Sequence, residues 1–173
     1  LRSVGHTVVD CGTHSKDAVD YPLIALEVAR RVAAGEADRG ILVDGAGIGS
    51  AMAANKVRGV LAAACPTEAL ARNAREHNDA NVLTLGAGHT DAAAARGIVD
   101  VFLASACTEE RHRRRVQMIR DFEQRGHTVV EHPSLSADDV ERIAQRVKEL
   151  IGGGRSAAGE PPPSPDEVAQ LID

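Results

Sequence analysis

The stretch Ile41–Lys56 (ILVDGAGIGSAMAANK) places a carboxylate directly before a glycine-rich turn. Asp44 follows the apolar run Ile41–Val43, which predicts a short buried strand. In open parallel sheets, ligands bind beyond the carboxyl ends of the strands, where Asp44 would lie. Three glycines would let backbone amides face an anionic ligand: Gly45, Gly47 and Gly49. A tight strand–helix turn with Asp44 as a helix cap explains the same pattern, and the spacing alone favours neither interpretation.

Two further groups have chemical potential. His77 and Asn78 end a predicted helix, where a histidine could move protons and an asparagine could donate to an oxyanion. Taken alone, a polar helix C-terminus, where histidine is also common, explains this pair more simply. Arg111 and Arg115 lie four residues apart, on one helical face, and paired guanidinium groups suit a phosphate. A solvated basic face, balanced by neighbouring glutamates, is the alternative.

The remaining composition argues against several classes of function. The three cysteines and seven histidines show no metal-ligand spacing, and the glycine turn lacks G-x-G-x-x-G spacing and a Walker lysine. We therefore predict no metal and no nucleotide cofactor. A net charge of −5 and 2 % aromatic residues disfavour nucleic acid and anionic membranes as partners. The odd cysteine count, with no signal peptide or apolar span visible, favours the cytoplasm.

Strand-like and helix-like segments alternate along most of the chain. The predicted strands are His6–Asp10, Gly40–Val43, Gly59–Cys65 and Asn81–Gly86. The predicted helices begin at Tyr21, near Ser50, at Thr67 (a plausible cap), at Thr90 and at Thr108. Strands separated by helices indicate βαβ crossovers and a parallel sheet. The fold class is therefore α/β, a Rossmann-like, doubly wound parallel sheet with three α/β/α layers.

The last fifty residues differ in character. Gly126–Glu131 (GHTVVE) nearly repeats Gly5–Asp10 (GHTVVD), and Ser136–Ile151 predicts an amphipathic helix. A Gly/Pro/Ser-rich linker and a short amphipathic end follow. The predicted organisation is a main domain over 1–125, a strand–helix extension over 126–151, a linker over 152–165, and the start of a domain or a targeting helix over 166–173.

Four motifs together resemble a known family. The motifs DYP, GILVDGAGIGSAMAANKVRGV, REHNDANVLTLG and ERHRRRV occur in the order found in type B ribose-5-phosphate isomerases and galactose-6-phosphate isomerases. The resemblance covers roughly Leu1 to Glu123. It implies a homodimer or tetramer with active sites shared between subunits and a phosphorylated pentose or hexose as substrate. The implied reaction is aldose–ketose isomerisation through a cis-enediolate, most simply of ribose 5-phosphate.

The resemblance also implies roles for individual residues. Asp44 stands where most members have a cysteine base, and partial burial is expected to raise its pKa towards a useful base strength. His77 would open the sugar ring, and Asn78 would bind the enediolate. The other expected substrate contacts are the amides of Gly45, Gly47 and Gly49, Ser50 (where another branch has a glutamate base), Tyr21 lining the pocket, and Arg111 and Arg115 on the phosphate.

Three departures favour a second interpretation. Ala46 replaces a common hydroxyl, and Gly88 replaces a common arginine. The family's first strand and most of its first helix have no counterpart in this sequence, which is expected to be either a fragment or a fold without that edge. The alternative is a non-catalytic sugar-phosphate-binding or scaffold module with the same fold. The end of the chain, SPDEVAQLID, resembles the opening of deoxyribose-phosphate aldolases. A fused aldolase domain is one interpretation of it, and a helix that targets a bacterial microcompartment shell is the other.

Overall fold

The structure, a computed structural model, describes residues 1–15, 17–125 and 136–152. The chain divides into two compact units, Leu1–Thr128 and Val129–Asp173. In the first unit, a short 3-10 helix (Arg2–Val4) is followed by eight further described elements: α1 (Tyr21–Ala33), β1 (Gly40–Asp44), α2 (Ile48–Ala54), β2 (Ala62–Ala64), α3 (Glu68–Glu76), β3 (Val82–Gly86), α4 (Ala92–Ala104) and α5 (Glu110–Arg125). In the second unit, the described element is α6 (Ala137–Gly152).

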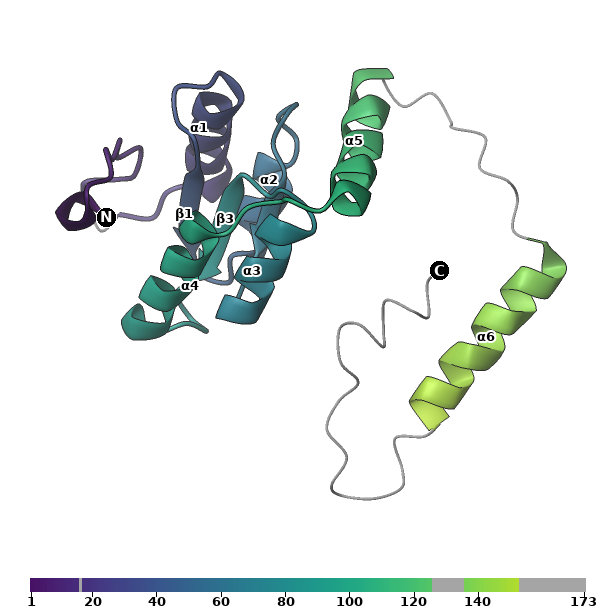
Figure 1. Cartoon of the computed structure of the whole chain (residues 1–173). Coiled ribbons are helices and arrows are strands. Elements are labelled where there is room, and N and C mark those ends of the chain that lie inside the picture. The colour runs from purple at the N-terminus through teal and green to yellow at the C-terminus, as the bar shows by residue number, and fades with distance from the viewer. Residues whose placement is uncertain (16, 126–135, 153–173) are drawn as a thin grey trace. The chain divides into compact units, whose positions relative to one another are not determined.

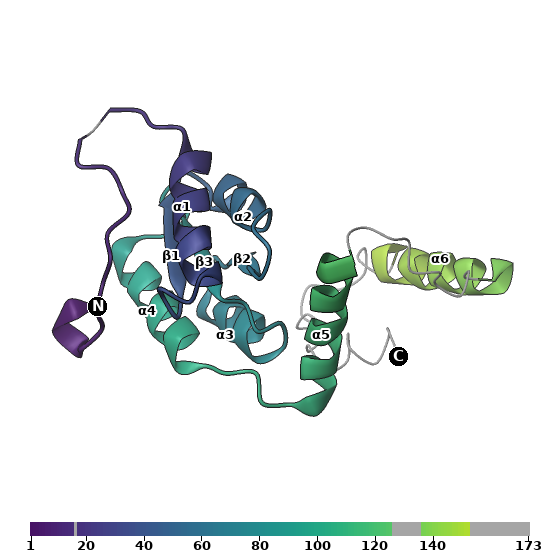
Figure 2. The ribbon, with the colours of Figure 1, turned by 90° about the horizontal axis from the view of Figure 1, so that it is seen from above.

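The core is a parallel three-stranded sheet in the order β1-β3-β2 (Figure 1). Gly40 pairs with Val82 and Asp44 with Gly86, so β1 and β3 run in register along their whole length. Every residue of the central strand β3 is buried. Helices α1 and α2 pack on one face of the sheet, and α3 and α4 pack on the other (Figure 2). The predicted α/β fold with three layers is confirmed.

Alanine-rich faces and local caps explain the helices. In α1, Pro22 lies in the first turn, where a missing N–H costs nothing, and Ala25 and Ala29 are fully buried against the sheet. Helix α3 begins at Thr67, whose hydroxyl accepts a hydrogen bond from the amide of Leu70 at 3.3 Å, as predicted. Small side chains on these faces let the helix backbones lie close to the strands.

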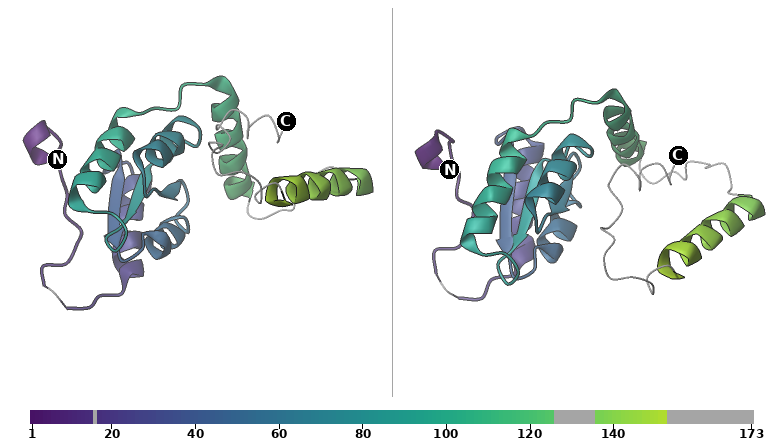
Figure 3. Two further views of the ribbon diagram at one scale, coloured as in Figure 1. Left: turned by 90° about the horizontal axis from the view of Figure 1, so that it is seen from below. Right: turned by 60° about the horizontal axis from the view of Figure 1, so that its bottom comes forward.

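The strand predicted at His6–Asp10 is wrong. The segment forms no strand, Val9 is 56 % exposed, and the chain before α1 runs outside the three layers (Figure 3). No described strand pairs with the segment, because β1 and β2 each pair with β3 alone, and an isolated strand cannot satisfy its own backbone.

The C-terminal predictions are tested in part. Helix α6 ends one residue beyond the helix predicted at Ser136–Ile151, and its Ile143 and Val147 are exposed. The GHTVVE segment, the linker after Gly152 and the end of the chain over 166–173 lie outside the described residues. In the part of the chain that the structure describes, no helix is both long and apolar enough to cross a bilayer.

Candidate active site in two clusters

The first cluster is the glycine turn, Asp44–Ser50, which joins β1 to α2. Asp44 ends β1, and its carboxylate accepts hydrogen bonds from the amides of Ala46 (2.9 Å), Gly47 and Ser50 (3.0 Å) and from the Ser50 hydroxyl (2.5 Å). Gly47, the residue before α2, has no side chain to cap the helix. Asp44 therefore does the capping from three residues upstream.

The hydrogen bonds set the basicity of Asp44. Partial burial raises the pKa of this carboxyl, but the hydrogen bonds from Ser50, Gly47 and Ala46 together outweigh it and hold the pKa below the ordinary 3.8. The sequence-based expectation of a raised pKa is wrong, because it counted the burial and not the four donors. Asp44 is ionised throughout the neutral range and is a weaker base than an unbonded carboxylate.

The glycine turn is packed tightly on one side and open on the other. Gly47 has a φ of 78°, and a Cβ there would lie 3.0 Å from the carbonyl carbon of Leu85. A Cβ at Gly49 would lie 2.6 Å from Cζ of Tyr21, so the tyrosine ring covers this glycine. A Cβ at Gly45 would meet no atom within 4 Å. The structure thus brings Tyr21, the predicted pocket residue, to the turn, and leaves space in front of Gly45.

A buried thiol follows β2, the next strand along the chain, which pairs with β3 and not with β1. Cys65 directly follows β2 and is 3 % exposed, and burial raises the pKa of its thiol to about 11. A thiol in that state stays protonated at neutral pH and cannot act as a base. Cys65 is therefore not a candidate for the base.

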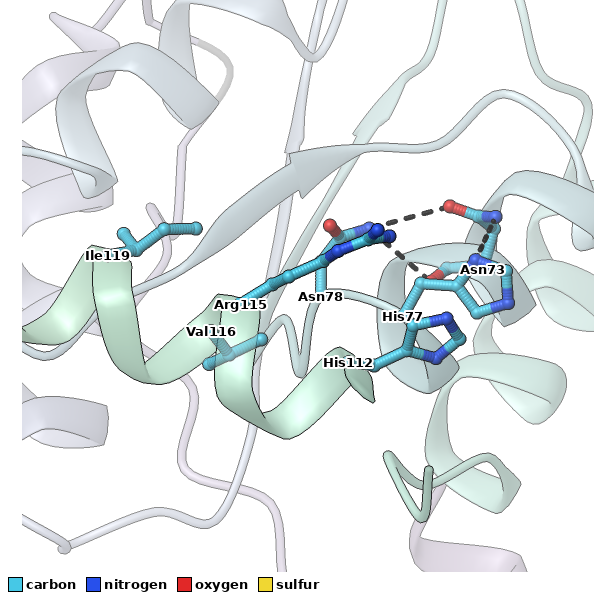
Figure 4. A pocket seen from close by; sticks show the side chains of 7 residues that line it. All are labelled: Asn73, His77, Asn78, His112, Arg115, Val116 and Ile119. Carbon is cyan, nitrogen blue, oxygen red and sulfur yellow. Dashed lines mark hydrogen bonds between the residues drawn. The ribbon is translucent and has the colours of Figure 1, made fainter. Parts of the chain in front are cut away.

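The second cluster is the His77 pocket, a cavity of about 190 Å³ between the end of α3 and α5. Figure 4 shows the side chains that line it: Asn73, His77, Asn78, His112, Arg115, Val116 and Ile119. Sites for small ligands usually measure about 300–1,000 Å³. The pocket is therefore smaller than a complete ligand site.

Hydrogen bonds within the pocket orient the His77 ring. Asn73 Nδ2 lies 3.0 Å from His77 Nδ1, while Asn73 Oδ1 accepts a longer, 3.4 Å bond from Asn78 Nδ2. With Asn73 donating through Nδ2, His77 Nδ1 holds a lone pair, and the ring proton of neutral His77 resides on Nε2. The arrangement makes His77 a hydrogen-bond donor through Nε2.

The ring of His112 packs against the ring of His77. Its ring centroid is 4.0 Å from that of His77, and the residue is only 4 % exposed. Its Nδ1 is buried without a hydrogen-bond partner in the described part of the chain. Burial, followed by the proximity of His77 and Arg111, lowers the pKa of His112. A neutral imidazole at this place avoids adding another positive charge beside Arg111 and Arg115.

The two clusters lie toward opposite ends of the parallel strands. Asp44 is at the carboxyl end of β1, whereas His77 and Asn78 precede β3 at its amino end. Gly40 and Asp44 pair with the two ends of β3, so the paired strands extend over four residue steps, or roughly 13 Å, from one end to the other. Of the predicted residues, His77, Asn78 and Arg115 come together in the pocket, with Arg111 one turn away on α5.

Sequence reasoning missed Asn73 and His112. Both had a signal in their spacing, because Asn73 lies four residues before His77 on one helical face, and His112 lies between the two predicted phosphate arginines. The spacing does not show that both residues contact His77, because these contacts form only when α5 packs against the end of α3.

The sequence is similar to known sugar-phosphate isomerases. The family model Ribose/Galactose Isomerase matches residues 1–119. Ribose-5-phosphate isomerase B of Escherichia coli K12 is 43 % identical over 121 residues, 70 % of this chain and 81 % of that protein.

Two solved structures are similar. Ribose-5-phosphate isomerase B of Clostridium thermocellum superposes with a TM-score of 0.70 at 44 % identity, over 72 % of this chain and 84 % of its own. The Mycoplasma genitalium enzyme, solved with bound ribulose-5-phosphate, gives a TM-score of 0.68 at 42 % identity, over 71 % and 82 %. The chain belongs to the ribose/galactose isomerase family of sugar-phosphate isomerases.

Proposed function

We propose that this protein interconverts ribose 5-phosphate and ribulose 5-phosphate, with Asp44 as the base and each active site formed by two copies of the chain. The observation that supports this most is the His77 pocket, which groups a hydrogen-bond donor, an amide and a guanidinium in one cavity. The relative with bound ribulose-5-phosphate supports the choice of sugar.

Asp44 would move the proton between C1 and C2 of the open-chain sugar. Its carboxylate is ionised and fixed by four hydrogen bonds, so it needs no reorientation before it accepts a proton. The open space in front of Gly45 would admit the reacting carbons, and its amide would face the enediolate oxygens. Tyr21 would close the side of the site next to Gly49.

His77 and the arginines would bind the other parts of the sugar. A hydrogen bond from His77 Nε2 to the ring oxygen would stabilise the charge that develops as the C1–O bond breaks. Asn78 would donate to an enediolate oxygen through its amide. Arg111 and Arg115, as guanidinium forks on one helix, would hold the phosphate.

A second copy is proposed because, within one chain, the two clusters lie at opposite ends of the paired strands β1 and β3. Proton transfer needs contacts of about 2.6–3.2 Å, and the clusters are separated by the length of the strand. Exposed apolar side chains border each cluster: Ile48 and Met52 beside the glycine turn, and Met118 and Ile119 on α5. In a two-fold dimer, the turn of one copy would face the pocket of the other, which gives two composite sites and covers these side chains.

One observation favours the second candidate, a non-catalytic sugar-phosphate-binding module. The carboxylate of Asp44 is fully engaged by its own turn, and its pKa is lowered rather than raised. A protein with this turn and an intact pocket could bind a phosphorylated sugar without turnover.

Proton NMR in deuterated water separates the two candidates. Incubation with ribose 5-phosphate is expected to produce ribulose 5-phosphate with deuterium at C1 and, through the reverse reaction, to place deuterium at C2 of the remaining ribose 5-phosphate. Asp44→Asn is expected to abolish product formation and exchange. Circular dichroism confirms that the variant is folded. Binding of ribose 5-phosphate without product or exchange would favour the binding module.

A further inference from the structure

Helix α5 contacts the rest of the first unit through residues along one of its faces. Its buried residues are His112 and Val116, and the next positions on that face, Arg120 and Glu123, bind the rest of the unit through polar contacts. Glu123 accepts a hydrogen bond of 2.8 Å from the amide of Gly59.

Asp79 binds this face to the end of α3. Its Oδ2 accepts a hydrogen bond of 2.7 Å from the Arg120 guanidinium, and its Oδ1 accepts one of 3.0 Å from the Arg75 guanidinium. Both contacts are also ion pairs. Arg75 is a rigid base for the contact, because its side chain is 3 % exposed and also donates to the carbonyls of Ser105 and Ala80. The carboxylate thus links a buried arginine of α3 to a surface arginine of α5.

The backbone at Asp79 is also unusual. Asp79 has a φ of 47°, the one positive value among the described residues other than glycine. Its amide and that of Ala80 close the end of α3 onto the carbonyls of Arg75 and Ala74. Glycine is the usual residue at such a left-handed helix end, so an aspartate here is present for its side chain.

We propose that Asp79 is a positioning residue, which through Arg120 sets where the phosphate-binding arginines of α5 lie relative to His77 and Asn78. Asp79 follows Asn78 directly, and Arg120 lies five residues, about 7.5 Å, beyond Arg115 along α5. One carboxylate therefore fixes both halves of the pocket. The role rests on the proposed function, because it assumes that α5 binds the phosphate.

The test compares Arg120→Met with Arg114→Met in the full-length protein. Arg114 is an exposed arginine of the same helix, so both changes remove one positive charge from α5. Arg120→Met is expected to raise KM for ribose 5-phosphate and Kd for inorganic phosphate roughly tenfold, with kcat nearly unchanged. Arg114→Met should leave all three near wild type, and Arg120→Lys should recover most of the loss.

A second variant acts on the carboxylate itself. Asp79→Gly keeps the left-handed turn and should reproduce the effect of Arg120→Met, and the double variant should be no worse than either single one.

Calorimetry with inorganic phosphate separates this proposal from the proposed function. Weaker phosphate binding by Arg120→Met in a protein that does not isomerise ribose 5-phosphate would support the positioning role and reject the activity. Equal phosphate binding by Arg120→Met and Arg114→Met, or none by the wild type, would overturn the positioning role whatever the turnover.

Discussion

The glycine turn and the His77 pocket are built in opposite ways. The turn satisfies itself, because all four donors to Asp44 come from within six residues of it in sequence. The pocket is assembled from two helices far apart in the chain, and one buried nitrogen of His112 has no partner among the described residues. We infer that local sequence fixes the proposed base, whereas tertiary packing fixes the proposed binding groups. Changes in the turn should therefore affect kcat, and changes in the phosphate-binding groups of the pocket should affect KM. His77, proposed to open the sugar ring, should affect kcat as well.

The largest expected effect is that of Asp44→Asn. Loss of a general base typically costs about 10²–10⁴ in rate, so kcat should fall by that factor while KM changes little. The matched control is Asp100→Asn, which neutralises an exposed carboxylate on α4 and should behave as wild type. Steady-state kinetics of both variants measure the difference. A loss of less than tenfold in kcat would show that Asp44 is not the base.

The matching change in the pocket is Arg115→Met. Removing a charged hydrogen-bond donor to the phosphate should raise KM about 10–100-fold and change kcat much less. Arg114→Met again removes the same charge from the same helix. If the two variants had equal KM values, Arg115 would contribute only general electrostatic attraction.

A smaller effect is expected for Ser50→Ala. Without the Ser50 hydroxyl, the pKa of Asp44 should rise, so the acid limb of the kcat/KM profile should move to higher pH. The Ser50→Ala substitution should also lower the free energy of unfolding at pH values above 3.8. A depressed carboxyl pKa contributes stability that is present above the ordinary 3.8 and lost as pH falls through the folded value, and Ser50→Ala should reduce this contribution. An unmoved acid limb would show that another group controls it.

The smallest effect concerns His112. Because its pKa is lowered in the folded state, the unfolded chain takes up this proton first, and stability should fall as pH drops below the ordinary 6.5. Urea midpoints at about pH 7.5 and about pH 5.5 should differ less for His112→Gln than for wild type. His89→Gln, at an exposed histidine, is the control. Equal pH dependence in all three proteins would contradict a neutral, buried His112.

The sequence was sufficient where a pattern is local. The parallel α/β order, the Thr67 cap and the place of Asp44 at the end of β1 follow from periodicity and turn residues, and all are confirmed. The His6–Asp10 strand failed because a short β-branched run predicts a strand only where another strand pairs with it, and no described strand does.

The pocket could be predicted in its residue types but not in its connections. His77, Asn78 and Arg115 were found by their chemistry, whereas Asn73, His112 and Asp79 act through contacts that form only when α5 packs on the end of α3. The pKa of Asp44 was wrong in direction because hydrogen-bond donors in a turn depend on its backbone path, which composition does not reveal.

The central claim, that each site combines the turn of one copy with the pocket of another, is tested most directly by mixing two inactive variants. Asp44→Asn and His77→Asn are each expected to be nearly inactive. Co-expressed in equal amounts and purified through two different tags, their mixed dimers would contain one intact site and one doubly altered site. The unpurified mixture also contains the two parental dimers, and statistical mixing should give it about a quarter of wild-type activity. Activity no greater than that of the two parents would contradict the shared site and place catalysis within a single chain.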